Sequence, residues 1–540
     1  MRPLARCALA VALLSIALAV AGCAPRETLV ARGDREQVLH RGVGYEVADL
    51  DPQLVTGLGE MKIVAALFEG LVGQDARDGR PVPAVAESWE VSPDALTFTF
   101  HLRAGARWSD GAPLTAQDFV DSWRRILTPS LAADNAPMLF VLRGAEAFHK
   151  NPAGDFSTVG AQASDARTLR VTLAQPTPYF LALLANAAWM PVPLRAIAAQ
   201  GDAFRRGNAW TRRGPLVGNG PFVLREWSPN RQIVVEKSPT YWDAASVRLH
   251  AIHFYPIDND DAEERAFRAG QLHVTEILPV SKVDAYRREQ PALLRIDPYL
   301  DTFFLRFNVR RAPLDDERVR RALSLALDRA ALAQKVLHAG QQPAATLVPP
   351  GLGGYVAPAR PLSDVAAARR LLAAAGYSAA HPLPALELML PNSGVLRLVA
   401  EAAQEMWRRD LGVDVRLLNQ EKKTIFAERR AGNYQILLYD WIGDYPDPTT
   451  FLDLWRSDSG NNHTAWSSRD YDALLDTAAR TAEPAARLAL LQRAEALLLD
   501  AAPIAPLYFN THAYLLQPSV KNWHPSPLDQ LDYKHVWLEP

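Results

Sequence analysis

Apolar and polar residues alternate in short runs along the first half of the chain. Residues 97–102 (TFTFHL) alternate with a period of two, which predicts a half-buried strand. Thr115 and Asp118 then have the spacing of a capping box, and the apolar positions that follow to Leu127 share one helical face. We therefore expect an α+β first half. Three further elements are predicted in it: strands at 232–236 and 249–256, and a helix at 261–269.

The pattern changes after about residue 301, where long helical stretches alternate with short apolar strands. Strand–helix–strand order at this spacing favours a parallel sheet covered by helices, so the second half is expected to be α/β. A ligand of two such units is expected in the crevice between them. The predicted helices are 315–337, 363–375, 395–410 and 483–500, and the predicted strands are 386–390, 413–418, 435–439 and 504–509.

Residues 1–22 have the pattern of a secretory signal. Two arginines precede an apolar run at 7–22, whose 16 residues are too few to span a membrane. The run leads into VAGC, which resembles the lipobox of bacterial lipoproteins. This resemblance implies cleavage before Cys23 and lipidation of that cysteine, with residues 23–36 as a tether. An ordinary secretory signal with an incidental cysteine is the alternative.

Composition narrows the class of protein. The 540 residues carry 58 Lys+Arg and 60 Asp+Glu, a net charge of -2, and 49% hydrophobic residues. This balance excludes a disordered chain, and the lack of a basic cluster excludes a nucleic-acid partner. The two cysteines are Cys7, inside the predicted signal, and Cys23, so the exported body is expected to contain no disulfide. Its stability must then come from packed cores.

The sequence contains no motif typical of a cofactor or metal site. Gly57 and Gly59 lack the remainder of a phosphate-binding loop, and neither a Gly-x-Ser-x-Gly elbow nor a His-Glu-x-x-His helix is present. His250 and His253 are three residues apart on a predicted strand, which places them on opposite faces. We therefore predict no cofactor and no metal ligands.

An acidic and aromatic segment follows the predicted strand that ends at Tyr439. Paired carboxylates beside aromatic rings are used by glycosidases, which would make Asp444 and Asp447 a catalytic pair. The same residues are typical of a strand-end turn, in which Asp and Pro only set the backbone. A third interpretation fits best: a carboxylate at a strand end, walled by Trp441 and Tyr445, receives a cationic group such as the α-ammonium of a peptide.

Several segments carry a resemblance to a known family. The most specific is ALTFTFHLRAGARWSDGAPLTAQDFVDSW at 95–123, which is joined by the segments at 67–89, 219–222, 238–244 and 307–329. Together they resemble the signature of the peptide/nickel-type extracellular solute-binding proteins (family 5) of ABC importers. WIGDYPDPTTFL and the near-terminal PLDQLDYKHVW are similar to the oligopeptide-binding branch. The resemblance covers essentially the whole exported chain.

The resemblance implies an α/β, bilobal fold of the periplasmic-binding-protein-like kind (type II, cluster C), with three domains and a central ligand cleft. The boundary near residue 301 coincides with the change of pattern described above. Two chain crossings, near Leu300 and Thr511, would form a hinge. Carried over to this sequence, lobe one comprises residues 37–68, 198–300 and 512–540, the inserted domain 69–197, and the second lobe 301–511.

The resemblance also implies a ligand site. Asp444 matches the family aspartate that holds the α-ammonium of a peptide. The peptide backbone would be bonded like an added strand, which makes the receptor tolerant of side-chain identity. The residues expected to line the cleft with Asp444 are Trp441, Ile442, Gly443, Gly57, Leu58, Arg429 and Tyr508.

The sequence departs from the family pattern at other cleft positions. Asp301 and Ile442 stand where close relatives pair two cysteines, and Lys422 stands in place of a cleft tryptophan. Leu438 occupies a position that receives a ligand carboxylate in those relatives. The anchor for the peptide N-terminus is thus kept, while the anchors for its C-terminus differ. The hypothetical replacements for them are Lys422, Arg397 and Arg429.

We therefore expect a binding protein and not an enzyme. It would be a monomeric, lipid-anchored receptor that captures oligopeptides outside the cytoplasmic membrane. Its partners would be the permease subunits of an ABC importer and, through the lipid on Cys23, the membrane. The alternatives are the same fold binding another solute, such as a murein or modified peptide, and a peptide sensor without transport.

Overall fold

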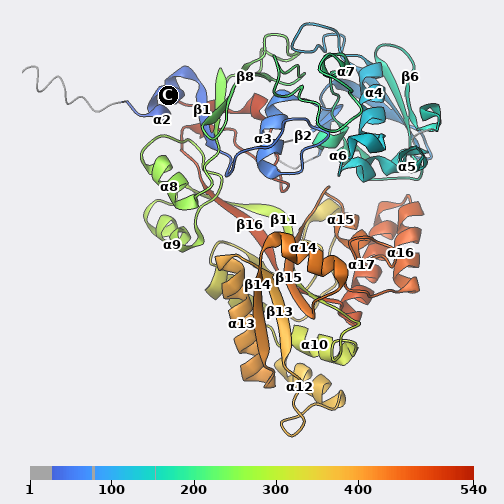
Figure 1. The fold of residues 1–540 in the computed structure, drawn as a ribbon, viewed down its shortest axis with the longest axis vertical. Coiled ribbons are helices and arrows are strands. Elements are labelled where there is room, and N and C mark those ends of the chain that lie inside the picture. The colour runs from blue at the N-terminus through green and yellow to red at the C-terminus, as the bar shows by residue number, and fades with distance from the viewer. Residues whose placement is uncertain (1–26, 76–79, 152–153) are drawn as a thin grey trace, which may run out of the picture.

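The computed structural model describes residues 27–75, 80–151 and 154–540. Figure 1 shows two parts of the molecule, which are joined by long strands. The predicted signal peptide and the predicted lipidation site at Cys23 lie outside the described residues. In the part of the chain that is described, no helix combines the length and apolar character needed to cross a membrane.

The first part contains a four-stranded sheet in the order β1-β10-β9-β8. β1 is parallel to β10, and the other neighbours are antiparallel. The strands predicted at 232–236 and 249–256 and the helix at 261–269 are confirmed. The elements are β1 (Val38–Gly42), α3 (Leu58–Leu67), β8 (Phe222–Ser228), β9 (Gln232–Lys237), β10 (Ala251–Tyr255), α8 (Asp260–Arg268) and α9 (Val280–Glu289).

The beginning of the described chain differs from the predicted tether. Its residues 29–36 form helix α2 (Leu29–Glu36), which packs on the sheet. Gly33 is buried so tightly that a Cβ there would lie 2.4 Å from the Val38 carbonyl oxygen. Asp34 lies 3.2 Å from the buried His273 ring nitrogen. The prediction of a tether is therefore wrong for residues 29–36. The segment is largely polar in sequence, but one face of α2 packs on the sheet.

A second four-stranded sheet, in the order β4-β5-β7-β6, lies in the same part of the molecule. The strand predicted at 97–102 is confirmed, and so is the capping box of Thr115 and Asp118 at the start of α4. The elements are β2 (Val72–Gln74), β3 (Pro81–Pro83), β4 (Ala86–Val91), β5 (Thr97–Leu102), α4 (Ala116–Leu127), α5 (Ala145–Lys150), β6 (Ala161–Ala163), β7 (Thr168–Thr172), α6 (Phe180–Leu183) and α7 (Leu194–Ala198).

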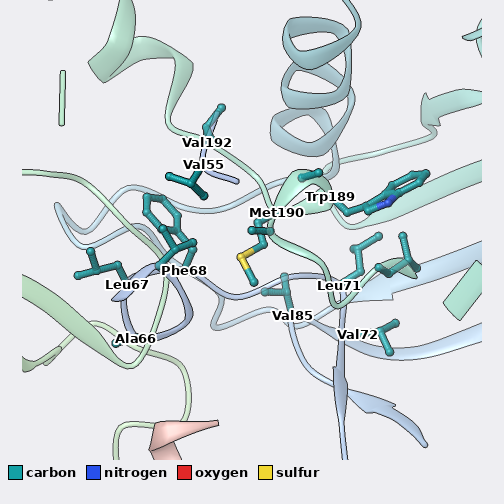
Figure 2. Close-up of a cluster of buried hydrophobic side chains, with 14 of the residues drawn as sticks. Val55, Ala66, Leu67, Phe68, Leu71, Val72, Val85, Trp189, Met190 and Val192 are labelled. Carbon is teal, nitrogen blue, oxygen red and sulfur yellow. The ribbon is translucent and has the colours of Figure 1, made fainter. Parts of the chain in front are cut away.

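One continuous apolar core joins both of these sheets. Trp123 of α4 packs edge-to-face on Trp189, with ring centroids 5.3 Å apart, and its indole N–H donates to the Trp189 carbonyl at 3.0 Å. A buried aromatic pair contributes about 0.5–1.5 kcal/mol beyond the area it buries. Figure 2 shows the adjoining cluster, in which Met190 lies between Phe68 and Leu71 in this view. The core thus fixes the end of α3 against the chain around residue 190.

The second part is built on a six-stranded sheet in the order β12-β16-β11-β15-β13-β14. β13 is parallel to β14 and β15, but β11 is antiparallel to β15 and β16. The four predicted strands, which are β13, β14, β15 and β16, therefore run in the same direction as predicted. The sheet is mixed because β11, which was not predicted, runs against them between β15 and β16, and β12 runs against β16 at the edge. The strands are β11 (Leu294–Phe307), β12 (Gln342–Pro343), β13 (Leu386–Pro391), β14 (Val415–Gln420), β15 (Ile436–Ile442) and β16 (Ile504–Leu515).

Helices cover this sheet (Figure 1). The predicted helices at 363–375, 395–410 and 483–500 are confirmed within two residues at each end. A short ribbon of β17 (Val520–Lys521) and β18 (Trp537–Leu538) completes the chain. The helices are α10 (Glu317–Leu325), α11 (Arg329–Ala331), α12 (Val365–Ala374), α13 (Gly394–Leu411), α14 (Lys422–Ala431), α15 (Thr449–Leu452), α16 (Arg469–Arg480) and α17 (Pro484–Ala501).

The single helix predicted at 315–337 is wrong. The chain forms α10, breaks, and continues as α11 and a π-helical turn at Leu332–Leu337. After the break, the Asp328 carboxylate accepts from a helical amide at 2.9 Å and begins the next helix. The buried guanidinium of Arg329 donates to the Pro506 carbonyl on β16 at 2.6 Å. These bonds to the rest of the fold override the local helical pattern.

The paired strands β11 and β16 connect the two parts (Figure 1). Their register runs from Leu294 opposite Leu515 to Arg306 opposite Ile504. It shifts between Pro298 and Thr302, close to the predicted hinge. The predicted boundaries of the lobes and of the inserted domain stay predictions.

Candidate functional site

The turn after β15 determines the position of Asp444. The Gly443 amide donates to the Leu300 carbonyl at 2.7 Å, and the Asp444 amide donates to Thr450 Oγ1 at 2.8 Å. A Cβ on Gly443 would lie 2.6 Å from a methyl carbon of Leu300, so a side chain does not fit there. These contacts hold Asp444 at the end of a central strand of the sheet.

The Asp444 carboxylate has solvent access and no compensating charge among the described residues. Its side chain is exposed, yet protein atoms surround it closely enough that desolvation raises its pKa to about 6. No hydrogen bond or ion pair within the described chain reaches its carboxylate oxygens. A partly desolvated anion in this state favours a cationic partner.

Asp447, three residues further on, has a different environment. Its two carboxylate oxygens each accept from Arg487 of α17 at 2.8 Å, and both side chains are buried. One of these oxygens also accepts from the Thr449 amide at 3.0 Å. Because these bonds occupy the carboxylate, Asp447 is a structural group. The geometry therefore argues against a catalytic pair of Asp444 and Asp447.

An aromatic contact connects the Asp444 turn with the first part of the molecule. Tyr445 stacks on Tyr179, the residue before α6, with ring centroids 4.5 Å apart and an angle of 7° between the planes. The guanidinium of Arg487 lies 5.9 Å from the Tyr179 ring. Sequence reasoning missed Tyr179, because the segment PTPYF has no periodic pattern that would indicate a contact so distant along the chain.

Trp441 and Ile442 are half-buried at the end of β15, opposite Thr302 and Asp301 of β11. The pairing of Ile442 with Asp301 makes neighbours of the two positions at which the family resemblance places cysteines. The Asp301 carboxyl is buried, accepts from Asn510 at 2.9 Å, and has a pKa raised by burial and by the nearby Asp440 charge. Trp441 has a buried indole nitrogen with no hydrogen-bond partner in the described chain.

Gly57 and Leu58 lie in the first part of the molecule, where they begin α3. Gly57 is the N-cap and has extended backbone geometry, and Leu58 is the first helical residue. Glu60 of the first turn accepts from the Tyr45 hydroxyl at 2.6 Å. A Cβ on Gly57 would collide with both of these groups, at 2.2 Å from each. Gly57 and Leu58 remain partly accessible to solvent.

Two of the basic candidates, Arg429 and Arg397, have different surroundings. Arg429 of α14 is half-buried, and its guanidinium lies 5.1 Å from the Phe426 ring and 5.5 Å from the Tyr439 ring. Burial lowers its pKa. Arg397 of α13 is exposed and bonds to Glu401 at 2.8 Å. None of these contacts joins the two arginines to each other.

The remaining two candidates are Lys422 and Tyr508. Lys422 begins α14, and its side chain lies outside the described residues. Tyr508 of β16 is only 2% exposed and stacks on Phe303 with ring centroids 4.8 Å apart. Burial raises the pKa of Tyr508 well above its usual range. The structure therefore places Tyr508 in the core of the sheet, without an accessible hydroxyl.

Glu276, His512 and Asp529 lie close enough together to bind a metal ion. However, the Lys62 ammonium bonds to Glu276 and to Asp529, each at 2.5 Å. The His512 ring also lies 3.3 Å from Asp529. The lysine thus supplies the cation at this cluster.

Comparison with known proteins gives the family. The profile of the bacterial extracellular solute-binding proteins, family 5 (middle region), matches residues 80–463. The chain is 37% identical over 525 residues to the periplasmic murein peptide-binding protein MppA of Escherichia coli, covering 96% of this chain and 95% of MppA. It is also 37% identical over 543 residues to the probable deoxycholate-binding periplasmic protein YgiS of the same species, covering 98% of each.

A solved structure agrees with these matches. Haemophilus influenzae OppA in complex with the peptide RPPGFSPFR superposes with a TM-score of 0.78 at 31% identity, covering 94% of this chain and 99% of that chain. This likeness confirms the α/β, bilobal fold expected from the sequence. The chain belongs to the bacterial extracellular solute-binding proteins of family 5.

Proposed function

We propose that this protein captures oligopeptides in a cleft between its lobes and delivers them to an ABC importer. The observation that carries the proposal is the Asp444 carboxylate, a strand-end anion whose pKa is raised to about 6 and which bonds to no cation in the described chain. The α-ammonium of a peptide would form a charge-assisted hydrogen bond with it. Peptides are also what the names of MppA and OppA give as the ligands of those relatives.

One side of β15 would bind the peptide backbone. β13 pairs with β15 only at Ile436 and Leu437. Beyond these residues, the side of β15 that faces away from β11 has no strand partner among the described residues. An extended peptide would add there as a strand alongside Trp441, Ile442 and Gly443. Bonds to backbone groups would explain how such a receptor accepts different side chains.

Ligand binding would favour a closed arrangement of the lobes. Gly57 and Leu58 would contact the peptide from lobe one, and β15 from the second lobe. The crossing strands β11 and β16 would act as the hinge between them. A ligand that touches both lobes shifts the population toward the closed form, which the permease subunits would recognise.

The C-terminal carboxylate of the peptide would bind Arg429. Its guanidinium is half-buried beside two aromatic rings, where an incoming carboxylate is weakly screened. Arg397 already bonds to Glu401 and is exposed, which makes it a weaker candidate. Lys422 at the start of α14 is the further candidate.

Lipid on Cys23 would hold the otherwise monomeric receptor at the membrane. The sequence VAGC supports this part of the proposal. Full-length protein is expected in the membrane fraction, and a Cys23→Ser variant is expected to leave it. Recovery of both proteins in the same soluble fraction would contradict lipid anchoring without touching the proposed ligand.

Native mass spectrometry of the purified body, without its first 26 residues, tests the proposed ligand class. Retained oligopeptides would appear as a series of bound masses separated by amino-acid residue masses. A single defined mass, of one murein or modified peptide or of a non-peptide solute, would instead support the second candidate, a receptor for another solute. That candidate is favoured by the names of MppA and YgiS, which include a murein peptide and deoxycholate. Normal peptide uptake in a strain without the gene would indicate a peptide sensor.

A further inference from the structure

Three histidines lie together beside helix α2, in the first part of the molecule. The ring of His40 on β1 stacks on the ring of His273, with centroids 5.5 Å apart and 5° between the planes. His253 of β10 meets His40 edge-on, with ring centroids 5.0 Å apart. His40 and His273 are 2% and 0% exposed. A buried cluster of this kind favours neutral rings, because like charges at such distances and away from water repel each other strongly.

Hydrogen bonds fix the neutral form of His273. Its Nδ1 accepts from the His40 amide at 3.0 Å, so the proton of the neutral ring is on Nε2. Nε2 lies 3.2 Å from the Asp34 carboxylate on α2 and donates to it. A second proton would have to bind at Nδ1, where it would remove the acceptor of the His40 amide. Protonation of this ring therefore breaks a bond inside the fold, in addition to placing a charge in a buried cluster.

Burial and the nearby charges act on the three rings in the same direction. Desolvation lowers the pKa of His40 to about 3, with smaller contributions from the two other rings and from Arg32 of α2. Desolvation also lowers the pKa of His273, although the Asp34 carboxylate opposes it, and it lowers the pKa of His253. Further charged or titratable groups around the cluster, within the described chain, are Tyr255 on β10, Glu226 on β8, Glu236 on β9 and Arg231. Because all three pKa values lie below that of a free histidine, proton uptake below about pH 6.5 favours a state in which the rings reach water.

Helix α2 is the element whose movement would expose the cluster. Among its eight residues, all of them described, only Gly33 is buried. A Cβ on Gly33 would lie 2.7 Å from the His273 ring and 3.2 Å from the His40 ring, so the helix backbone rests directly on both. Figure 1 shows α2 beside β1, at the edge of the first part. An element with so little buried apolar surface is expected to open before the rest of the fold.

We propose that His40, His253 and His273 form an acid-sensitive latch for α2, which stays docked while the rings are neutral and detaches when they take up protons. The latch does not depend on the proposed ligand or on the lipid. One consequence does rest on the proposed lipid anchor at Cys23. Release of α2 would add its eight residues to the segment that connects the body to the membrane, so the body would reach further from the membrane in acid.

Hydrogen exchange of the purified full-length protein, measured by mass spectrometry at about pH 7.5 and pH 5.5, tests the latch. Protection factors, which correct for the intrinsic effect of pH on exchange, are compared for α2 and for α13 in the other part of the molecule. The protection of α2 is expected to fall about tenfold between these pH values for each histidine that takes up a proton on release. The protection of α13 should stay within about twofold. Unchanged protection of α2 would overturn the latch, and so would an equal loss in both helices, which would indicate general unfolding in acid.

A double variant locates the latch in the two rings that touch α2. His273→Asn keeps an acceptor for the His40 amide, and His40→Asn keeps a polar group near the Tyr255 hydroxyl, but neither asparagine takes up a proton. The double variant is expected to reduce the loss of α2 protection between the two pH values to less than about threefold. His381→Asn is the matched control, because His381 is exposed in the other part of the molecule and its replacement should leave the loss as in the parent.

A folded double variant, verified by circular dichroism, that kept the pH dependence of the parent would contradict the assignment of the latch to these rings. If the double variant does not fold, the comparison of α2 with α13 in the parent protein still decides. The membrane fractionation of the Cys23→Ser variant tests the lipid anchor separately, so the two proposals can fail independently.

Discussion

Replacement of Asp444 by Asn tests the proposed anchor with the smallest change in shape. The substitution removes the charge but keeps the size of the side chain. In the complex it leaves the peptide ammonium beside a neutral amide in a desolvated place. Loss of one partner of a buried charge pair costs about 2–5 kcal/mol in binding. Because Asp444 keeps solvent access, we expect the lower end, about 2 kcal/mol, which corresponds to about 30-fold weaker binding.

The same variant should fold at least as well as the parent protein. Desolvation raises the pKa of Asp444, so the folded state holds its proton more tightly than the unfolded chain does. A raised carboxyl pKa means that ionisation, which is nearly complete at pH 7, disfavours the folded state. Removal of the charge relieves this penalty, so the melting temperature is expected to stay the same or rise. Weaker binding together with unchanged or higher stability is typical of a functional group.

Calorimetric titration with one retained peptide, paired with thermal melting, measures both effects. Asp458→Asn serves as the control, because Asp458 is an exposed aspartate in the same part of the molecule and its replacement makes the same change in charge. The control should match the parent in affinity and in melting temperature. Parent-like affinity of the Asp444→Asn variant would refute the assignment of the ammonium anchor.

Three further perturbations have outcomes that follow from the structure. The pKa of about 6 for Asp444 predicts constant peptide affinity above about pH 7 and about tenfold loss per pH unit below pH 6, because the ammonium needs the ionised carboxylate. A series of calorimetric titrations at different pH values checks this, and an affinity that does not change with pH would contradict it. Arg487→Met should destabilise the fold by about 3–5 kcal/mol in urea denaturation, because it leaves the buried Asp447 carboxylate without its arginine. The control Arg321→Met breaks only an exposed pair and should cost under about 1 kcal/mol. Equal costs would contradict the assignment of Asp447 as a structural group. Gly443→Ala should lower the melting temperature and peptide affinity through the clash with a leucine of β11, while Gly460→Ala, with open space around it, should change neither.

Local patterns predicted most of the helices and strands, but not their long-range arrangement. The capping box at Thr115 identified the start of α4, because its bonds connect residues three positions apart. The position of β11, which lies antiparallel between β15 and β16, depends on pairing with β16 residues some 200 positions away, which no local pattern records. The break before Arg329 has the same origin, since its guanidinium bonds to a distant strand.

The residues of the candidate site were likewise predicted only in part. Asp444 was identified as a strand-end carboxylate and through the family resemblance, and the turn of Gly443 and Thr450 explains its position. Neither route predicted Tyr179, because its contact with Tyr445 depends on how distant segments pack. Tyr508 was expected at the cleft but is packed against Phe303, which shows how little a sequence match says about side-chain exposure.

The contrast between Asp444 and Asp447 gives the clearest physical argument about this site. Both carboxylates lie in one short turn, and both are removed from bulk water to some extent. Asp447 has an arginine on both oxygens, which is the usual way to accommodate such a charge. Asp444 is held by its backbone, while its carboxylate has no partner in the part of the chain that the structure describes. A fold keeps an uncompensated anion of this kind, at a cost in stability, where a cation from outside completes it.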